Sequence, residues 1–199
     1  MSVDQTWLSR NLKKLGNIGV INPNRQEYQV RRSQNVKALN WKYSGRIDAL
    51  TFRVDRDVWL TGIGVCTPYK LYKLTKINEM KLLRGNTTRS EVVYLHSHSV
   101  CLMADFVSGV NKVSFETIVK LDADTDYTIY LKISGAKTVK CVDSLTTVKG
   151  RDGTTFQFSN TIFVQGDESN RTDVQCGPIV DFCYLTELEH LSYECDGIN

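Results

Sequence analysis

The sequence predicts an all-β protein, an antiparallel β-sandwich of about ten strands with a short N-terminal helix. Short apolar runs recur between turn signals roughly every 8–15 residues, which is typical of sandwiches. Residues 112–121 alternate apolar and polar side chains, the pattern of a strand with one buried face. Residues 58–65 are apolar on both faces, as expected of a central strand.

The N-terminal residues 4–15 have the periodicity of a short amphipathic helix, with four apolar residues on one face: Trp7, Leu8, Leu12 and Leu15. Residues 16–35 have a loop-like composition. A helix this short is marginal alone, so one hypothesis is that it docks on the sandwich or on a partner. The predicted organisation has three parts: an N-terminal helix and linker (1–35), a sandwich (36–186) and an acidic C-terminal tail (187–199).

Residues 41–66 contain the two strands around which the chain is organised. Three apolar residues of the first strand recur at a period of two and share one face: Leu50, Phe52 and Val54. Residues 55–57 form a tight turn, and a second strand at 58–65 completes a predicted hairpin. Gly62 and Gly64 share one face of this second strand, where glycine indicates close approach of a bulky neighbour or another backbone.

A second hairpin is predicted further along the chain. The strand at 112–121 is followed by an acidic turn and by a strand with four residues on one face: Tyr127, Ile129, Leu131 and Ile133. Further strands are predicted at 90–96, 99–106, 154–158 and 178–185. Four aromatic residues are assigned to the core: Trp41, Phe52, Phe115 and Phe156.

Composition indicates an ordinary globular protein. The chain has 199 residues, of which 41% are hydrophobic and 24% charged. No apolar run approaches the roughly 18 residues of a membrane span, and the N-terminus lacks the apolar region of a signal peptide. We therefore expect a cytoplasmic protein that does not bind membranes. Residues 1–46 carry nine Lys/Arg against two acids, a charge of +7, whereas residues 166–199 carry one Arg against eight acids, a charge of −7.

The candidate metal and catalytic residues have weak signatures. Six cysteines are widely spaced without a C-x-x-C motif, which favours buried, reduced thiols. His96 and His98 share a strand face near Cys101, but their spacing matches no zinc motif. The acidic turn at 122–126 lacks the later ligands of a calcium loop. We expect no cofactor, no bound metal and no nucleic acid.

The central stretch resembles the PHR domain of the Pam, Highwire and RPM-1 ubiquitin ligases, most closely the copies that follow BTB and BACK domains in cullin adaptors. The matching positions are Trp41, Tyr43, Gly45, Asp48, Phe52, Val54, Asp55, Gly62 and Gly64. The strand that ends at Gly135 resembles part of the family's central hairpin, and residues 170–179 partly match its closing segment. The resemblance covers roughly residues 36–186 and is weak between 67 and 108.

The resemblance implies a sandwich that recognises a partner protein in a ubiquitin pathway, beside a BTB domain that engages a cullin or a RING that recruits the conjugating enzyme. This sequence contains neither, so we expect a non-catalytic, monomeric interaction module. Because rigid scaffolds commonly display binding residues on loops, seven loop residues are the candidate partner-binding site: Thr67, Pro68, Tyr69, Lys137, Asn170, Arg171 and Asp173. The alternative is a small-ligand or metal-binding, hydrolytic sandwich that uses His96, His98 and a cysteine.

Overall fold

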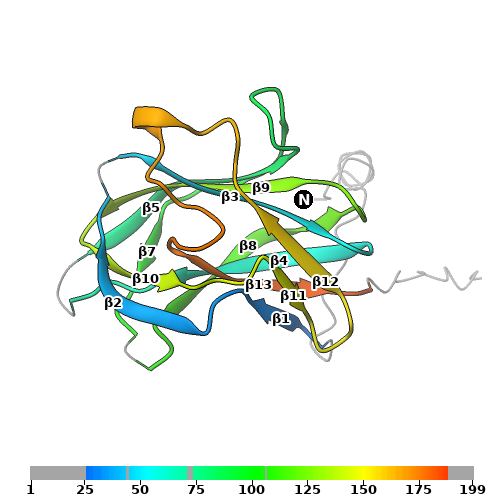
Figure 1. The fold of residues 1–199 in the computed structure, drawn as a ribbon, viewed down its shortest axis with the longest axis horizontal. Coiled ribbons are helices and arrows are strands. Elements are labelled where there is room, and N and C mark those ends of the chain that lie inside the picture. The colour runs from blue at the N-terminus through cyan, green and yellow to red at the C-terminus, as the bar shows by residue number, and fades with distance from the viewer. Residues whose placement is uncertain (1–25, 44, 71–73, 106, 188–199) are drawn as a thin grey trace, which may run out of the picture.

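The computed structural model describes residues 26–43, 45–70, 74–105 and 107–187. Within these residues the chain forms strands β1 to β13 and one short 3-10 turn, η1 (Gly166–Glu168). The strands make two main antiparallel sheets and one two-stranded sheet (Figure 1). The predicted all-β sandwich is therefore confirmed. The predicted N-terminal helix lies outside the described residues, as does the tail from residue 188.

The larger sheet has the order β11-β12-β3-β9-β5-β6, and β7 pairs with the same edge of β5 as β6 does. All its pairings are antiparallel. Its strands are β3 (Ile47–Val54), β5 (Thr75–Arg84), β6 (Glu91–Leu95), β7 (Val100–Leu102), β9 (Tyr127–Gly135), β11 (Thr147–Lys149) and β12 (Thr155–Ser159).

The smaller sheet has the order β1-β13-β4-β8, and β2 pairs with β10 in a separate ribbon. The strands of the smaller sheet are β1 (Tyr28–Arg31), β4 (Val58–Cys66), β8 (Val110–Leu121) and β13 (Ile179–Leu185). The ribbon consists of β2 (Asn35–Trp41) and β10 (Thr138–Val142).

The prediction of two hairpins is wrong. β3 pairs with β12 and β9, whereas β4, which follows the turn at 55–57, pairs with β13 and β8 in the other sheet. β8 and β9 are likewise divided between the two sheets, so both turns cross the sandwich instead of closing a hairpin. We call the end of the molecule that contains these crossing turns the arch end. The two turns contact each other there, because the Asp124 amide donates to the Val54 carbonyl at 2.8 Å.

The loop assignment of residues 16–35 is wrong at its C-terminal part. Residues 28–31 form β1, which pairs with β13 through Tyr28 opposite Tyr184 and Arg31 opposite Asp181. Arg32, the next residue, is fully buried, and its guanidinium donates to the carbonyls of Ile179 at 2.7 Å and Val174 at 2.8 Å. The sheet therefore begins before residue 36, while the wider division into linker, sandwich and tail stays a prediction.

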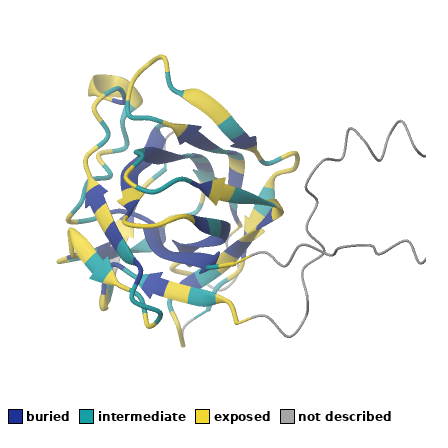
Figure 2. Cartoon of the chain, turned by 90° about the vertical axis from the view of Figure 1, so that its right-hand side faces the viewer, coloured by how far each residue is buried: buried dark blue, intermediate teal, exposed yellow. Residues whose placement is uncertain are grey.

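The main core lies between the two sheets. The predicted inward faces of β3 and β9 are confirmed, since Leu50, Phe52 and Val54 are all buried, as are the alternate residues of β9 from Tyr127 to Ile133. All four aromatic residues assigned to the core are buried as well. Phe52 packs across the sandwich on Phe182, with ring centroids 4.7 Å apart. Figure 2 shows the buried residues on the inner strands and the exposed residues mainly on the periphery.

The two glycines of β4 lie where neighbouring groups come close, as the sequence indicated. A Cβ at Gly62 would stand 2.5 Å from the Val113 carbonyl oxygen, and a Cβ at Gly64 would stand 2.6 Å from the Asp181 Cβ. β4 is the central pairing partner of β8 and β13, so glycine lets both neighbours approach it. The described cysteines are free, as predicted, and Cys66, Cys141 and Cys183 are buried. The prediction of burial is wrong for Cys101, which is exposed, and Cys176 is only half-buried.

Candidate functional site

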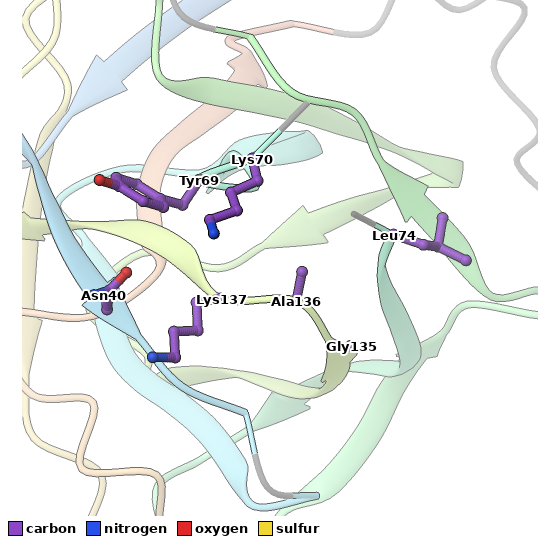
Figure 3. A pocket seen from close by; sticks show the side chains of 7 residues that line it. All are labelled: Asn40, Tyr69, Lys70, Leu74, Gly135, Ala136 and Lys137. Carbon is purple, nitrogen blue, oxygen red and sulfur yellow. The ribbon is translucent and has the colours of Figure 1, made fainter. Parts of the chain in front are cut away.

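A hollow of about 610 Å³ opens at the end of the sandwich opposite the arch end (Figure 3). We call it the apical pocket. β4 leads away from the arch end into one wall, and the turn between β9 and β10 forms another. The described residues that line it are Asn40, Tyr69, Lys70, Leu74, Gly135, Ala136 and Lys137.

A buried threonine fixes the wall that follows β4. Thr67 is only 1% exposed, and its amide donates to the Gly109 carbonyl at 3.0 Å while its hydroxyl donates to the Asp105 carbonyl at 3.2 Å. Its own carbonyl accepts from the Val139 amide at 3.0 Å. The Tyr69 amide then donates to the Lys137 carbonyl at 2.9 Å, which joins the two walls of the apical pocket.

The opposite wall depends on a glycine turn. Gly135 has φ of +101°, and a Cβ there would stand 2.3 Å from the Leu74 carbonyl oxygen, so glycine alone fits without strain. The same carbonyl accepts from the Ala136 amide at 2.9 Å, and the Thr75 hydroxyl donates to the Ala136 carbonyl at 2.9 Å. The turn that presents Lys137 is thereby held against the start of β5.

The apical pocket combines positive charge with exposed apolar surface. Lys70 and Lys137 are exposed, and neither ammonium pairs with a carboxylate of the residues that the structure describes. Tyr69 is 40% exposed and Leu74 is 62% exposed. Figure 3 shows the lysines on different walls and Leu74 at the far side. A site of this kind can hold an anionic group beside an apolar one.

The predicted site residues fall into two groups. Tyr69 and Lys137 come from different loops, and both line the apical pocket. Thr67 and Pro68 are buried behind them. The remaining three residues occupy the loop before β13 and do not line the pocket. Whether any of the seven binds a partner stays a prediction.

The loop before β13 is organised around a buried carboxylate. Asp48 accepts hydrogen bonds from Trp41 Nε1 at 3.0 Å, Asn170 Nδ2 at 3.1 Å and the Thr172 hydroxyl at 2.6 Å. Burial raises the pKa of Asp48 to about 6, and these hydrogen bonds oppose that rise. Asn170 therefore anchors the loop. Arg171 is exposed with φ of +66°.

Asp173 stabilises the turn that follows in the same loop. Its carboxylate accepts from the amides of Gln175 at 2.7 Å and Cys176 at 2.8 Å. Its carbonyl accepts from the buried Arg32 guanidinium at 3.4 Å. Asn170 and Asp173 thus both have internal partners, and of the three predicted residues in this loop Arg171 is the exposed one.

Sequence reasoning missed five of the lining residues: Asn40, Lys70, Leu74, Gly135 and Ala136. Gly135 had a signal, because a glycine after a predicted strand marks a turn and turns form the rims of sandwiches. Asn40 had none, since nothing in the sequence indicates that β2 leaves the main sheets to form a ribbon with β10.

Comparison with known proteins places this architecture in a family. The sequence model of the PHR domain matches residues 31–185, which is most of the chain. This chain belongs to the PHR domain family. The match begins at the last residue of β1 and ends with β13, so it contains both sheets of the sandwich except for most of β1.

Curated relatives of this PHR domain are larger proteins. The chain is 29% identical over 155 residues to BTB/POZ domain-containing protein 6 of Homo sapiens, and 26% identical over 153 residues to the protein of the same name from Xenopus laevis. BTB/POZ domain-containing protein 6-A of Danio rerio is 26% identical over 153 residues. Each match covers 77% of this chain but only 26% or 27% of the relative, so the chain spans about a quarter of their length.

The histidine-based alternative does not assemble in the described part of this PHR domain. His96 Nδ1 lies 2.6 Å from the Tyr94 hydroxyl and His96 Nε2 lies 3.6 Å from Glu116 Oε1, whereas His98 is exposed. Among the described residues, no three His, Cys, Asp or Glu side chains are grouped so that they could hold a metal ion. Two of the three carboxylates in the acidic turn at 122–126 are used internally, since Asp122 pairs with Arg84 and Asp126 with Arg53.

No helix in the described part of the chain is long and apolar enough to span a membrane.

Proposed function

We propose that this PHR domain is a non-catalytic protein-interaction module that recognises a partner or substrate protein in a ubiquitin-ligase pathway. The observation that carries the proposal is the apical pocket, where exposed tyrosine and leucine side chains stand beside two lysines that pair with no carboxylate of the described residues. Exposed apolar groups rimmed by polar ones are typical of protein-binding surfaces.

The chemistry of the apical pocket supports binding over catalysis. Its described lining contains no histidine, cysteine or carboxylate that could act as a nucleophile or general base. The ubiquitin link rests on the family resemblance and on relatives whose name includes a BTB/POZ domain. We further propose a cytoplasmic, monomeric protein without cofactor, nucleic acid or membrane binding; light scattering coupled to size-exclusion chromatography tests the monomer.

The test is capture of proteins from cytosolic lysate on the immobilised full chain, followed by binding of the purified captured protein. The decisive variant is Leu74→Asp, which places a charge on the apolar part of the pocket. Its matched control is Leu145→Asp, at an exposed leucine between β10 and β11. We expect one direct partner that the Leu74 variant loses by at least about tenfold in affinity and the Leu145 variant keeps.

Two results would contradict the proposal. One is the absence of any direct partner of the wild-type chain. The other is a partner whose affinity falls equally in both leucine variants, because that result would place binding outside the apical pocket. Circular dichroism of each variant checks that the sandwich is retained.

A further inference from the structure

We infer that the occupant of the apical pocket is an extended acidic peptide segment of a partner protein, with a large apolar side chain among its acidic residues. This inference rests on the proposed function, because it names the chemistry that the partner presents to the pocket. Three features carry it: uncompensated positive charge, an apolar surface that continues beyond the pocket, and a free strand edge beside it.

The charge of the pocket has one sign. Lys70 and Lys137 contribute two ammonium groups, and no described lining residue is acidic. Asp105 lies behind the pocket wall that follows β4, where its carbonyl accepts from the Thr67 hydroxyl. Its carboxylate stabilises its own turn, since it accepts hydrogen bonds from the amides of Val107 at 2.8 Å and Ser108 at 3.1 Å. A carboxylate-rich segment would supply the missing negative charge.

The apolar surface extends past the pocket. Thr75 of β5 pairs with Leu102 of β7, and the next residues outward along the two strands are Leu74 and Met103. Met103 is 69% exposed and Leu74 is 62% exposed. A purely ionic ligand would leave this surface in water, whereas a segment with a Leu, Met or aromatic side chain would cover it.

The free strand edge favours an extended peptide. Within the described residues β2 pairs only with β10, and Asn40 of β2 lines the pocket. An unpaired edge offers backbone donors and acceptors to an added strand. An acidic peptide that runs along β2 could therefore place its charges near the lysines and its apolar side chain near Leu74.

The chain's own acidic tail is a less suitable occupant. β13 runs away from the apical pocket, since Ile179 pairs with Val65 and Leu185 pairs with Trp59 near the arch end. The strand that precedes the tail therefore ends at the opposite end of the molecule from the apical pocket (Figure 1). Nucleic acid is also disfavoured, because single-stranded binding sites combine a basic groove with stacking aromatics, and this pocket has two lysines and one tyrosine.

The experiment measures fluorescence polarisation of the full chain with labelled peptides of the form Gly-Glu-Asp-Glu-X-Glu-Asp-Glu-Gly. Four probes have Leu, Met, Phe or Trp at X. Two control peptides have Gly at X or Lys in place of every acid, and the third control is an oligouridylate with the same net charge as the probes. The decisive variant is Lys70→Glu combined with Lys137→Glu. Lys149→Glu is the matched control, at an exposed lysine on β11 with no ion pair among the described residues.

The expected result is saturable binding of at least one acidic probe that weakens with added salt. The double lysine variant should bind about tenfold more weakly and Lys149→Glu should bind normally. In ¹⁵N spectra the shifted amides should include Tyr69 and Ala136.

The inference is overturned if no acidic probe binds, or if the Gly, lysine or oligouridylate control binds as well as the best probe. Peptide binding that tightens at least about tenfold when residues 188–199 are deleted would identify the tail as the occupant and also overturn it. The proposed function fails separately. If a captured partner depends on Leu74 while no acidic probe binds, the interaction module stands and only the acidic-peptide inference is lost.

Discussion

Asp48 shows how a single buried carboxyl group couples the fold to pH. Its folded pKa of about 6 lies above its ordinary value of 3.8, because burial penalises the charged form. The folded state therefore binds more protons than the unfolded state between these two values. The stability linked to Asp48 is fully present below pH 3.8 and is lost as pH rises through 6.

We predict that the free energy of unfolding falls by about 1 kcal/mol between pH 5 and pH 7 through Asp48. The Asp48→Asn variant stays neutral and should lose this part of the pH dependence. Urea unfolding of both proteins at the two pH values measures the difference. Carboxyl groups whose folded pKa is lowered, such as Asp55 and Asp152, remain ionised across this range and cancel in the comparison. Equal pH dependence of both proteins would contradict the prediction.

Gly62 supports a second prediction at the scale of one residue. The Gly62→Ala variant would place a Cβ 2.5 Å from the Val113 carbonyl oxygen and 3.0 Å from the Ser114 Cα, both backbone atoms of the neighbouring strand. We expect a loss of about 3 kcal/mol in the free energy of unfolding, measured in urea. The control Gly166→Ala, where no atom lies within 4 Å of the added Cβ, should cost about 1 kcal/mol through its left-handed backbone alone. A smaller loss at Gly62 than at Gly166 would contradict this account.

At the scale of elements, β1 is tied to the sandwich by an ion pair. Asp181 is nearly fully buried and accepts from Arg31 at 2.8 and 2.9 Å and from Gln29 at 2.7 Å. The Asp181→Ala variant should destabilise the protein by about 2 kcal/mol, since it leaves a half-buried guanidinium without its partner. Hydrogen exchange of residues 28–31 should accelerate more than that of β3. Unchanged exchange in β1 would show that its backbone pairing alone holds it.

The elements also show how far sequence patterns reach. Alternation located β3, β8, β9 and β12, because a half-buried strand must place every second side chain in the core. It did not identify their pairing partners. A turn as short as 55–57 joins two strands equally well within one sheet or across a sandwich, and local sequence does not distinguish the two outcomes. β1 was missed because a four-residue edge strand that contains Gln, Arg and Tyr is too short and too polar to show an alternating pattern of apolar residues.

The candidate site was predictable only in part for the same reason. Tyr69 and Lys137 were proposed from loop position, and the structure brings them together through the Tyr69 amide and the Lys137 carbonyl. Asn170 and Asp173 were proposed on equal grounds, but the structure uses their side chains internally. Whether a polar loop side chain turns outward or satisfies a buried group depends on tertiary contacts, here Asp48 and the Asp173 turn.

At the scale of the whole molecule, the topology predicts slow folding. β1 pairs with β13 and β3 pairs with β12, so strands far apart in the sequence must meet before either sheet is complete. We expect refolding in roughly milliseconds to seconds, measured by stopped-flow fluorescence of the buried Trp41 after dilution from urea. Refolding within microseconds would contradict this expectation, and Trp41→Phe provides the control that assigns the signal.

The antiparallel pairing of β1 with β13 has a practical outcome for how this domain is tethered. Residue 26 and residue 187 both adjoin the arch end, because Tyr28 stands opposite Tyr184. A linker, an immobilisation tag or a neighbouring domain attached through either described end would therefore hold the molecule at its arch end. The apical pocket would then face away from the attachment point and would remain open to a ligand in solution.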